Sequence, residues 1–179
     1  MLELNEWLLE FSRSQNNHIA LNAGWLEVER YSLSPLLSST INFILNGGTM
    51  LLCSDYRFDW FVHFVTSNIN SKDRPLVPII PLKSILPDTQ RLSEYSIVQD
   101  MLSVSFKEYR FWYIGSPNND IAKLALSKEK GFLWVLDEEI RDAFIINSRD
   151  KLLHYKLIQL YKIFEATLFG AMFGEISLD

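Results

Sequence analysis

One stretch decides the fold, and it reads Leu45-Asn46-Gly47-Gly48-Thr49-Met50-Leu51-Leu52-Cys53-Ser54-Asp55. Its glycines predict the end of a helix, because glycine adopts the left-handed C′ conformation at little cost. The apolar run 49–53 predicts a buried strand, and residues 58–70 have the spacing of a helix. In α/β proteins, ligands are usually held at the carboxyl ends of such strands. Residues 54–57 are therefore the first place to look for a site.

The composition limits the kind of protein. With 179 residues the chain is long enough for one well-cored domain and short for two, so we expect a single domain over residues 1–179. The net charge of −5 argues against direct binding of nucleic acid through its phosphates. A single cysteine, Cys53, excludes an intramolecular disulfide framework and suits a reducing cytoplasm. We find neither a secretory signal nor an apolar run of about 18 residues, and we expect a cytoplasmic protein with no membrane contact.

Two helices are predicted before the first strand. Apolar residues recur at helical spacing within 2–11, and the pattern resumes over 25–45. Pro35 is expected to bend or divide the second helix, because proline lacks the backbone donor. Such a long helical start is a common place for a dimer interface.

Strands and helices alternate in the middle of the chain. Further strands are expected at residues 76–80, 111–115, 132–136 and, as a candidate fifth, 144–147. Helices are expected at 97–106 and 120–127, although 103–106 fits an extended segment equally well. Pro78 predicts an edge or irregular strand. The alternation implies an open, mostly parallel sheet with helices on both faces.

The final helix is expected to begin at Ser148 or Asp150, both plausible N-caps, and to run to about Phe173. Apolar residues cover well over half of its circumference. A helix of this kind is buried on more than one side. We expect one face to pack on the sheet and the other against a second subunit.

The opening stretch, together with Arg74-Pro75-Leu76-Val77-Pro78-Ile79-Ile80-Pro81-Leu82, resembles the start of SIS (sugar isomerase) domains. The resemblance implies an α/β, SIS-like (Rossmann/flavodoxin-like) three-layer sandwich, with a mostly parallel central sheet and long N- and C-terminal helices. It also implies a sugar-phosphate site after the first strand. A sugar-phosphate isomerase or sugar-phosphate-binding protein is therefore one functional alternative.

The residues of that site depart from the SIS pattern. SIS proteins hold the phosphate with a Gly-Asn-Gly-Gly-Ser-type loop, whereas this chain has Ser54-Asp55-Tyr56-Arg57-Phe58. Bulky side chains stand where backbone must approach a phosphate, and Asp55 adds a negative charge. Ser67 and Asn68 stand near the position of the isomerases' catalytic glutamate, and neither serves as a general base. We therefore expect no enzyme activity.

Longer blocks, spread over nearly the whole chain, resemble the HobA family of replication-initiation regulators. They are residues 23–30, 45–48, 74–76, 132–134 and 160–169. The resemblance implies an SIS-like homotetramer that binds the N-terminal domain of the initiator DnaA and promotes its oligomeric assembly at the origin. The resemblance implies no cofactor and no catalytic activity.

Two groups of residues are candidates for contact with DnaA. Asp55, Tyr56 and Arg57 form one, and the alternative for them is an ordinary exposed loop after a strand. Leu168 and Phe169 form the other, because resemblance to the related DiaA proteins implies a contact role for a Leu-Phe pair near the end of the last helix. The alternative for this pair is that both side chains pack in the core.

Trp25, Glu29 and Arg30 are candidates for the oligomer interface, since the helices before the first strand have no sheet of their own to cover. The alternative is a helix start with solvated charges and one buried tryptophan. The three histidines lie in separate segments without an i, i+4 partner, so no metal site is expected. Cys53, at the end of a buried strand, is expected to be an inert small hydrophobe.

Overall fold

The structure is a computed structural model that describes residues 2–71, 73–86 and 95–178, except for 17–23. It divides into two compact units. The terminal unit comprises Met1–Asn42 and Arg149–Asp179, and the sheet unit comprises Phe43–Ser148. The single domain over residues 1–179 stays a prediction.

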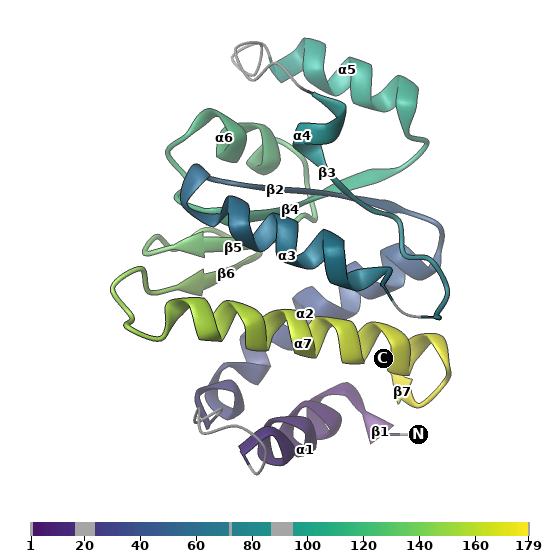
Figure 1. The fold of residues 1–179 in the computed structure, drawn as a ribbon, viewed down its shortest axis with the longest axis vertical. Helices are drawn as coiled ribbons and strands as arrows, with labels where there is room; N and C mark the ends of the chain where they lie inside the picture. Colours follow the sequence, from purple (N-terminus) through teal and green to yellow (C-terminus); the bar gives the residue numbers. More distant parts are fainter. Residues whose placement is uncertain (1, 17–23, 72, 87–94, 179) are drawn as a thin grey trace. The chain divides into compact units, whose positions relative to one another are not determined.

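The sheet unit contains five parallel strands in the order β3-β2-β4-β5-β6 (Figure 1). They are β2 (Thr49–Ser54), β3 (Ile79–Pro81), β4 (Tyr109–Gly115), β5 (Phe132–Leu136) and β6 (Ala143–Ile146). Numbered along the chain, this order is 2-1-3-4-5, which is that of flavodoxin-like folds. The predicted α/β fold with a parallel sheet is confirmed.

Helices cover both faces of this sheet. A 3-10 turn, η1 (Tyr56–Phe58), leads into α3 (Asp59–Ile69), whose Phe61 ring packs on Trp112 and Trp134 at centroid distances of 6.4 and 5.6 Å. The opposite face carries a separate apolar cluster. That cluster includes residues of α4 (Leu82–Ile85), α5 (Tyr95–Ser105) and α6 (Asp120–Leu126). Adjacent strand residues point to opposite faces, so the long apolar runs of β4 and β5 supply both layers.

The terminal unit contains three long helices and a small sheet. The helices are α1 (Leu4–Asn16), α2 (Gly24–Leu45) and α7 (Leu153–Met172). β1 (Leu2–Glu3) pairs in parallel with β7 (Ile176–Ser177), a pairing that the sequence did not predict. The Ser38 hydroxyl donates to the Leu178 carbonyl at 2.7 Å, which ties the C-terminal segment to α2. None of the described helices combines the length and apolarity that a membrane span requires.

One helix prediction is wrong, and another holds at most in one of its two forms. Pro35 lies inside α2, which excludes division of the helix, and a bend at Pro35 stays a prediction. The carbonyl that loses its donor belongs to Tyr31, a residue exposed at the surface. The last helix starts at Leu153, without a side-chain cap. Asp150 instead forms a turn, in which its carboxylate accepts the Leu152 N–H at 2.8 Å.

Two strand predictions also differ from the structure. The strand expected over 76–80 begins only at Ile79, although it does lie at the sheet edge, as Pro78 predicted. The Pro78 carbonyl still accepts the Met50 N–H at 2.9 Å. Residues 103–105 belong to α5, which excludes the extended alternative for most of 103–106.

Candidate functional site

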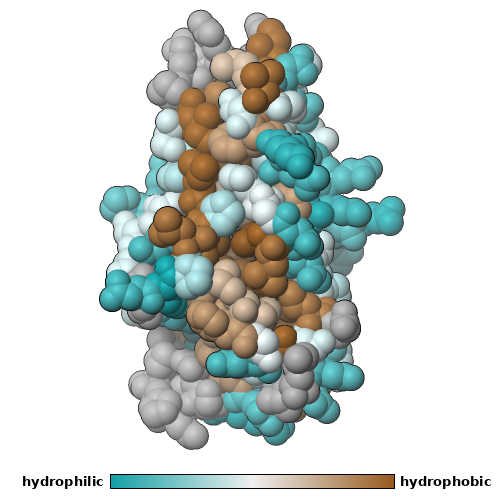
Figure 2. All heavy atoms as spheres, turned by 90° about the vertical axis from the view of Figure 1, so that its right-hand side faces the viewer, coloured by the Kyte–Doolittle hydropathy of each residue, from teal (hydrophilic) through white to brown (hydrophobic). Residues whose placement is uncertain are grey.

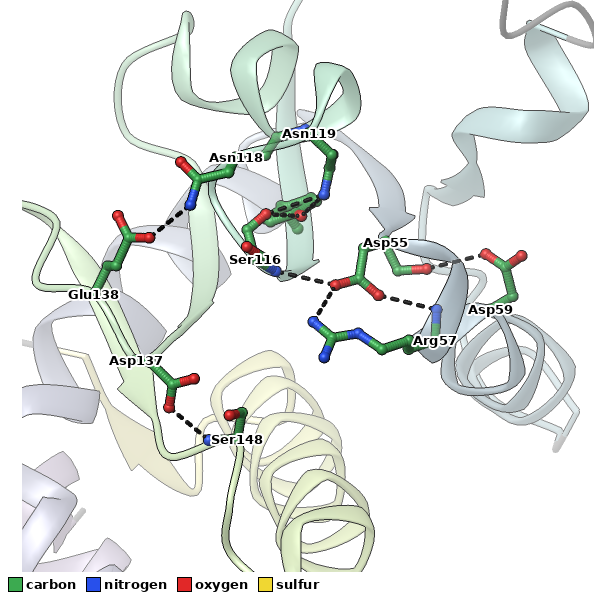
Figure 3. A network of polar contacts seen from close by, with 12 residues as sticks. Asp55, Arg57, Asp59, Ser116, Asn118, Asn119, Asp137, Glu138 and Ser148 are labelled. Carbon is green, nitrogen blue, oxygen red and sulfur yellow. Dashed lines mark hydrogen bonds and ion pairs between the residues drawn. The ribbon is translucent and has the colours of Figure 1, made fainter.

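The candidate site lies where the strand order reverses, between β2 and β4. From β2 the chain crosses to β3 on one side, and it later returns to place β4 on the other. In open parallel sheets, ligands bind in the crevice beyond the carboxyl ends of two such strands. Here Asp55 follows β2 and Ser116 follows β4 (Figure 3).

The Asp55 carboxylate occupies this switch point. Its side chain is only 6% exposed. Oδ1 accepts the Arg57 N–H at 2.9 Å, and Oδ2 accepts Arg57 Nη2 at 2.9 Å and the Ser116 N–H at 3.1 Å. The hydrogen bond that the Arg57 guanidinium donates to Asp55 raises the pKa of this guanidinium above its ordinary value. One protein carboxylate thus joins the loops that follow two neighbouring strands.

Gly115 makes this close approach sterically allowed. Its φ is +148°, a conformation that side chains rarely adopt. A Cβ at this position would lie 2.8 Å from Asp55 Oδ2 and 2.7 Å from the Tyr113 hydroxyl oxygen. Glycine is therefore required twice, for its backbone conformation and for space.

The Ser116 peptide is held from its other side. Its carbonyl accepts the Tyr113 hydroxyl at 2.6 Å and Asn119 Nδ2 at 3.0 Å. Burial raises the pKa of the Tyr113 phenol, so the hydroxyl stays a donor at neutral pH. Asn119 Oδ1 also accepts the Ala122 N–H at 2.8 Å and so caps α6. These bonds hold Ser116 through its carbonyl, which belongs to the peptide after the one that carries its N–H.

A second carboxylate, Asp59, is paired beside the first. Its oxygens accept the Ser54 hydroxyl at 3.2 Å and the Lys83 ammonium at 2.6 Å. The adjoining cavity has a volume of about 20 Å³ and mainly apolar walls. That is room for about one water, whereas sites for small organic ligands measure about 300–1,000 Å³. A sugar phosphate does not fit in this cavity.

The remaining loops at this edge of the sheet are also tied by acidic residues. Asn118 Nδ2 donates to Glu138 Oε1 at 2.7 Å, and Asp137 Oδ1 accepts the Ser148 N–H at 2.8 Å (Figure 3). The result is an ordered, acid-rich surface from which Tyr56 projects, 82% exposed.

The carboxylates and the thiol described at this site are paired or buried. Asp55 and Asp59 are each bonded to a cationic side chain. Burial raises the pKa of the Cys53 thiol, which therefore stays protonated and unreactive. Among the described residues, no three His, Cys, Asp or Glu side chains form a group that could hold a metal ion.

The predicted contact residues fall into two environments. Asp55, Tyr56 and Arg57 lie together at the carboxyl edge of the sheet. Leu168 and Phe169 are buried within α7, as the core-packing alternative expects. A contact role for this pair stays a prediction, and it would require the pair to become accessible.

The predicted interface residues bond mainly within their own unit. Trp25 Nε1 donates to Gln159 Oε1 at 2.9 Å, and the Glu29 carboxylate accepts the Ser32 hydroxyl at 3.1 Å. Arg30 donates to the Glu27 carbonyl and to the Tyr31 hydroxyl. Their interface role stays a prediction.

Other apolar side chains are more exposed than the predicted interface residues. Val28 and Tyr31 are exposed on α2, and Ile97, Met101 and Val104 are half or more exposed on α5. Figure 2 shows apolar side chains at the surface near the top of the molecule, where α5 lies. The α5 residues follow i, i+4, i+7 spacing, a signal that is present in the sequence.

Comparisons with known proteins agree on one family. The family model described as "HobA: DNA replication regulator" matches residues 1–178. The DNA replication regulator protein HobA of Helicobacter pylori is 35% identical over 182 residues, covering 99% of this chain and 100% of that protein. A chain in the crystal structure of a HobA-DnaA (domain I-II) complex from H. pylori matches with a TM-score of 0.78 at 33% identity, over 99% of both chains. A crystal structure of HobA from the same organism matches with a TM-score of 0.76 at 32% identity, over 98% of this chain and 99% of that one.

Proposed function

Because this chain belongs to the HobA family of DNA replication regulators, we propose that it binds the N-terminal domain of DnaA and promotes DnaA assembly at the replication origin. One observation carries the proposal. The chain aligns over 99% of its length with a relative whose solved structure is a complex with DnaA domains I and II. The working form in this proposal is a cytoplasmic homotetramer.

The proposed mechanism is multivalent binding without chemistry. Several DnaA molecules held on one assembly experience a high effective concentration, which favours their cooperative assembly without new catalytic groups. The switch point supports this proposal, because the Asp55 carboxylate fills it and Arg57 neutralises that charge. The net charge of −5 also suits a protein that acts on DNA through DnaA rather than by direct contact.

The sugar-phosphate alternative has no supporting observation. The cavity beside β2 has a volume that would fit about one water. The loop N–H of Ser116 already has a carboxylate acceptor. Fold alone does not imply the isomerase reaction.

For the contact surface we propose Tyr56 as the anchor, with Asp55 and Arg57 beside it. Tyr56 lies between two residues that bond to each other, so its backbone is already ordered before a partner binds. A preorganised tyrosine offers a large apolar area and a hydroxyl at a low cost in conformational entropy. This is the kind of residue that often dominates an interface.

Tyr56→Ala is expected to weaken binding of DnaA domains I and II by about tenfold or more, which corresponds to about 1.4 kcal/mol. Isothermal titration calorimetry with the unaltered chain and the variant measures this loss. It also tests the proposed function itself, because the unaltered chain must bind saturably.

Leu76→Ala is the matched control. Leu76 is 81% exposed, close to the 82% of Tyr56, but it lies before β3 and so belongs to the opposite edge of the parallel sheet. The affinity of the Leu76→Ala variant for DnaA should equal that of the unaltered chain. Equal affinities of the unaltered chain, Tyr56→Ala and Leu76→Ala would show that Tyr56 does not contribute to the interface. Absence of binding by the folded, unaltered chain would contradict the proposed function.

A further inference from the structure

We propose that the Asp55 carboxylate is an internal ligand, which fills a small-oxyanion site at the β2/β4 switch point. Without that carboxylate, the same donors would take a phosphate or sulfate ion. The inference is independent of the proposed binding of DnaA. It explains in molecular terms why this chain keeps the sheet of a ligand-binding fold while the ligand position is closed.

Three donors converge on the carboxylate. They are the Ser116 N–H at 3.1 Å, the Arg57 N–H at 2.9 Å and Arg57 Nη2 at 2.9 Å. Backbone N–H groups combined with a guanidinium are the groups with which proteins commonly hold phosphate and sulfate. The donor set therefore matches an oxyanion, and a protein oxyanion now occupies it.

The backbone that carries the two N–H donors has bonds that do not involve the Asp55 side chain. The Ser116 carbonyl accepts Tyr113 and Asn119, which keeps Ser116 in place at the end of β4. The Asp55 backbone has bonds of its own: its N–H donates to the Ile114 carbonyl at 3.0 Å, and its carbonyl accepts the Phe58 N–H at 3.0 Å. Truncation of the side chain leaves all of these bonds in place.

The site would also be open to an ion from solvent. Gly115 has no Cβ, and a Cβ there would lie 2.8 Å from Asp55 Oδ2, so glycine is the residue that allows an oxyanion oxygen at this place. The Arg57 side chain is 46% exposed, so it forms an outer wall that reaches water. The Asp59 carboxylate, four residues after Asp55, is neutralised by Lys83 at 2.6 Å. Removal of the carboxylate thus leaves a small, positively charged pocket.

The test compares the unaltered chain with Asp55→Ala by thermal unfolding, in sodium phosphate and in sodium chloride of equal ionic strength. The variant should be stabilised saturably by phosphate, by about 3–6 °C at ten times the dissociation constant. Sulfate should act in the same way. The unaltered chain should show no difference between the salts, because its carboxylate already fills the site.

Two further variants identify the site. Asp59→Ala also removes a carboxylate from this edge of the sheet, but one that no loop N–H holds. It should gain no response to phosphate. Adding Arg57→Ala to Asp55→Ala removes one donor and should abolish most of the response.

The inference is overturned if Asp55→Ala responds equally to phosphate and chloride, or if Asp59→Ala gains the same response. If Asp55→Ala does not fold in chloride, phosphate should restore its circular dichroism spectrum. Asp55→Ser, which keeps one small acceptor, then serves as the folded variant for the same comparison. Absence of any phosphate effect on both variants contradicts the proposal.

Discussion

Replacement of Trp134 by alanine is expected to lower the free energy of unfolding by about 3–5 kcal/mol. Trp134 is fully buried in the sheet unit. Its ring lies 5.6 Å from Phe61, 5.3 Å from Trp112 and 5.2 Å from Phe132 in centroid distance. The change removes a large apolar side chain and leaves a cavity that three other rings surround. Denaturant unfolding, followed by circular dichroism, measures the loss.

The variant Trp134→Phe distinguishes the contribution of aromatic packing from that of the indole N–H. Phenylalanine keeps most of the aromatic packing, and it removes an N–H that has no hydrogen-bond partner among the described residues. A cost well below that of alanine is expected, because loss of an unsatisfied buried donor offsets part of the lost area. Tyr56→Ala, on the exposed loop, should change stability by no more than about 0.5 kcal/mol. A Trp134→Ala cost as small as that of Tyr56→Ala would show that this aromatic layer does not stabilise the fold.

Gly115→Ala is expected to cost about 3 kcal/mol, because strain and a steric clash act together. The residue has a φ of +148°, and the added Cβ would lie 2.8 Å from the Asp55 carboxylate and 2.7 Å from the Tyr113 hydroxyl. Relief of the clash requires Asp55 to move away from the Ser116 N–H, which opens the switch point. Denaturant unfolding measures the cost.

Gly47→Ala is the control for backbone strain alone. Gly47 has a φ of +88°, with nothing within 4 Å of an added Cβ. It should cost about 1 kcal/mol, the ordinary penalty of a left-handed conformation. Equal costs at Gly47 and Gly115 would mean that the contact with Asp55 contributes nothing.

The sheet was predictable from sequence because its strands are buried on both faces. Continuous apolar runs over 111–115 and 132–136 predicted β4 and β5 with bounds within two residues of those in the structure. The strands β1 and β7 have two residues each, too few for any periodicity, and they pair across nearly the whole chain length. Their pairing depends on tertiary structure, which local sequence does not record.

Half of the candidate site was predictable. Asp55 and Arg57 lie two residues apart, so the turn after β2 indicated them directly. Ser116 lies 61 residues further along, directly after the strand that we predicted over 111–115. The pairing becomes predictable once β2 and β4 are known to be neighbours, because parallel strands place their carboxyl ends at one edge. That strand order was not contained in any local pattern.

The most direct test of the proposed function is native mass spectrometry of the full chain, mixed with a DnaA fragment of domains I and II. The proposed multivalent binding predicts a tetramer of the 20.9 kDa chain that carries at least two DnaA fragments at once. Assembly of DnaA by multivalent binding requires both properties together. A monomer that binds a single DnaA fragment, or a tetramer that binds none, would contradict it.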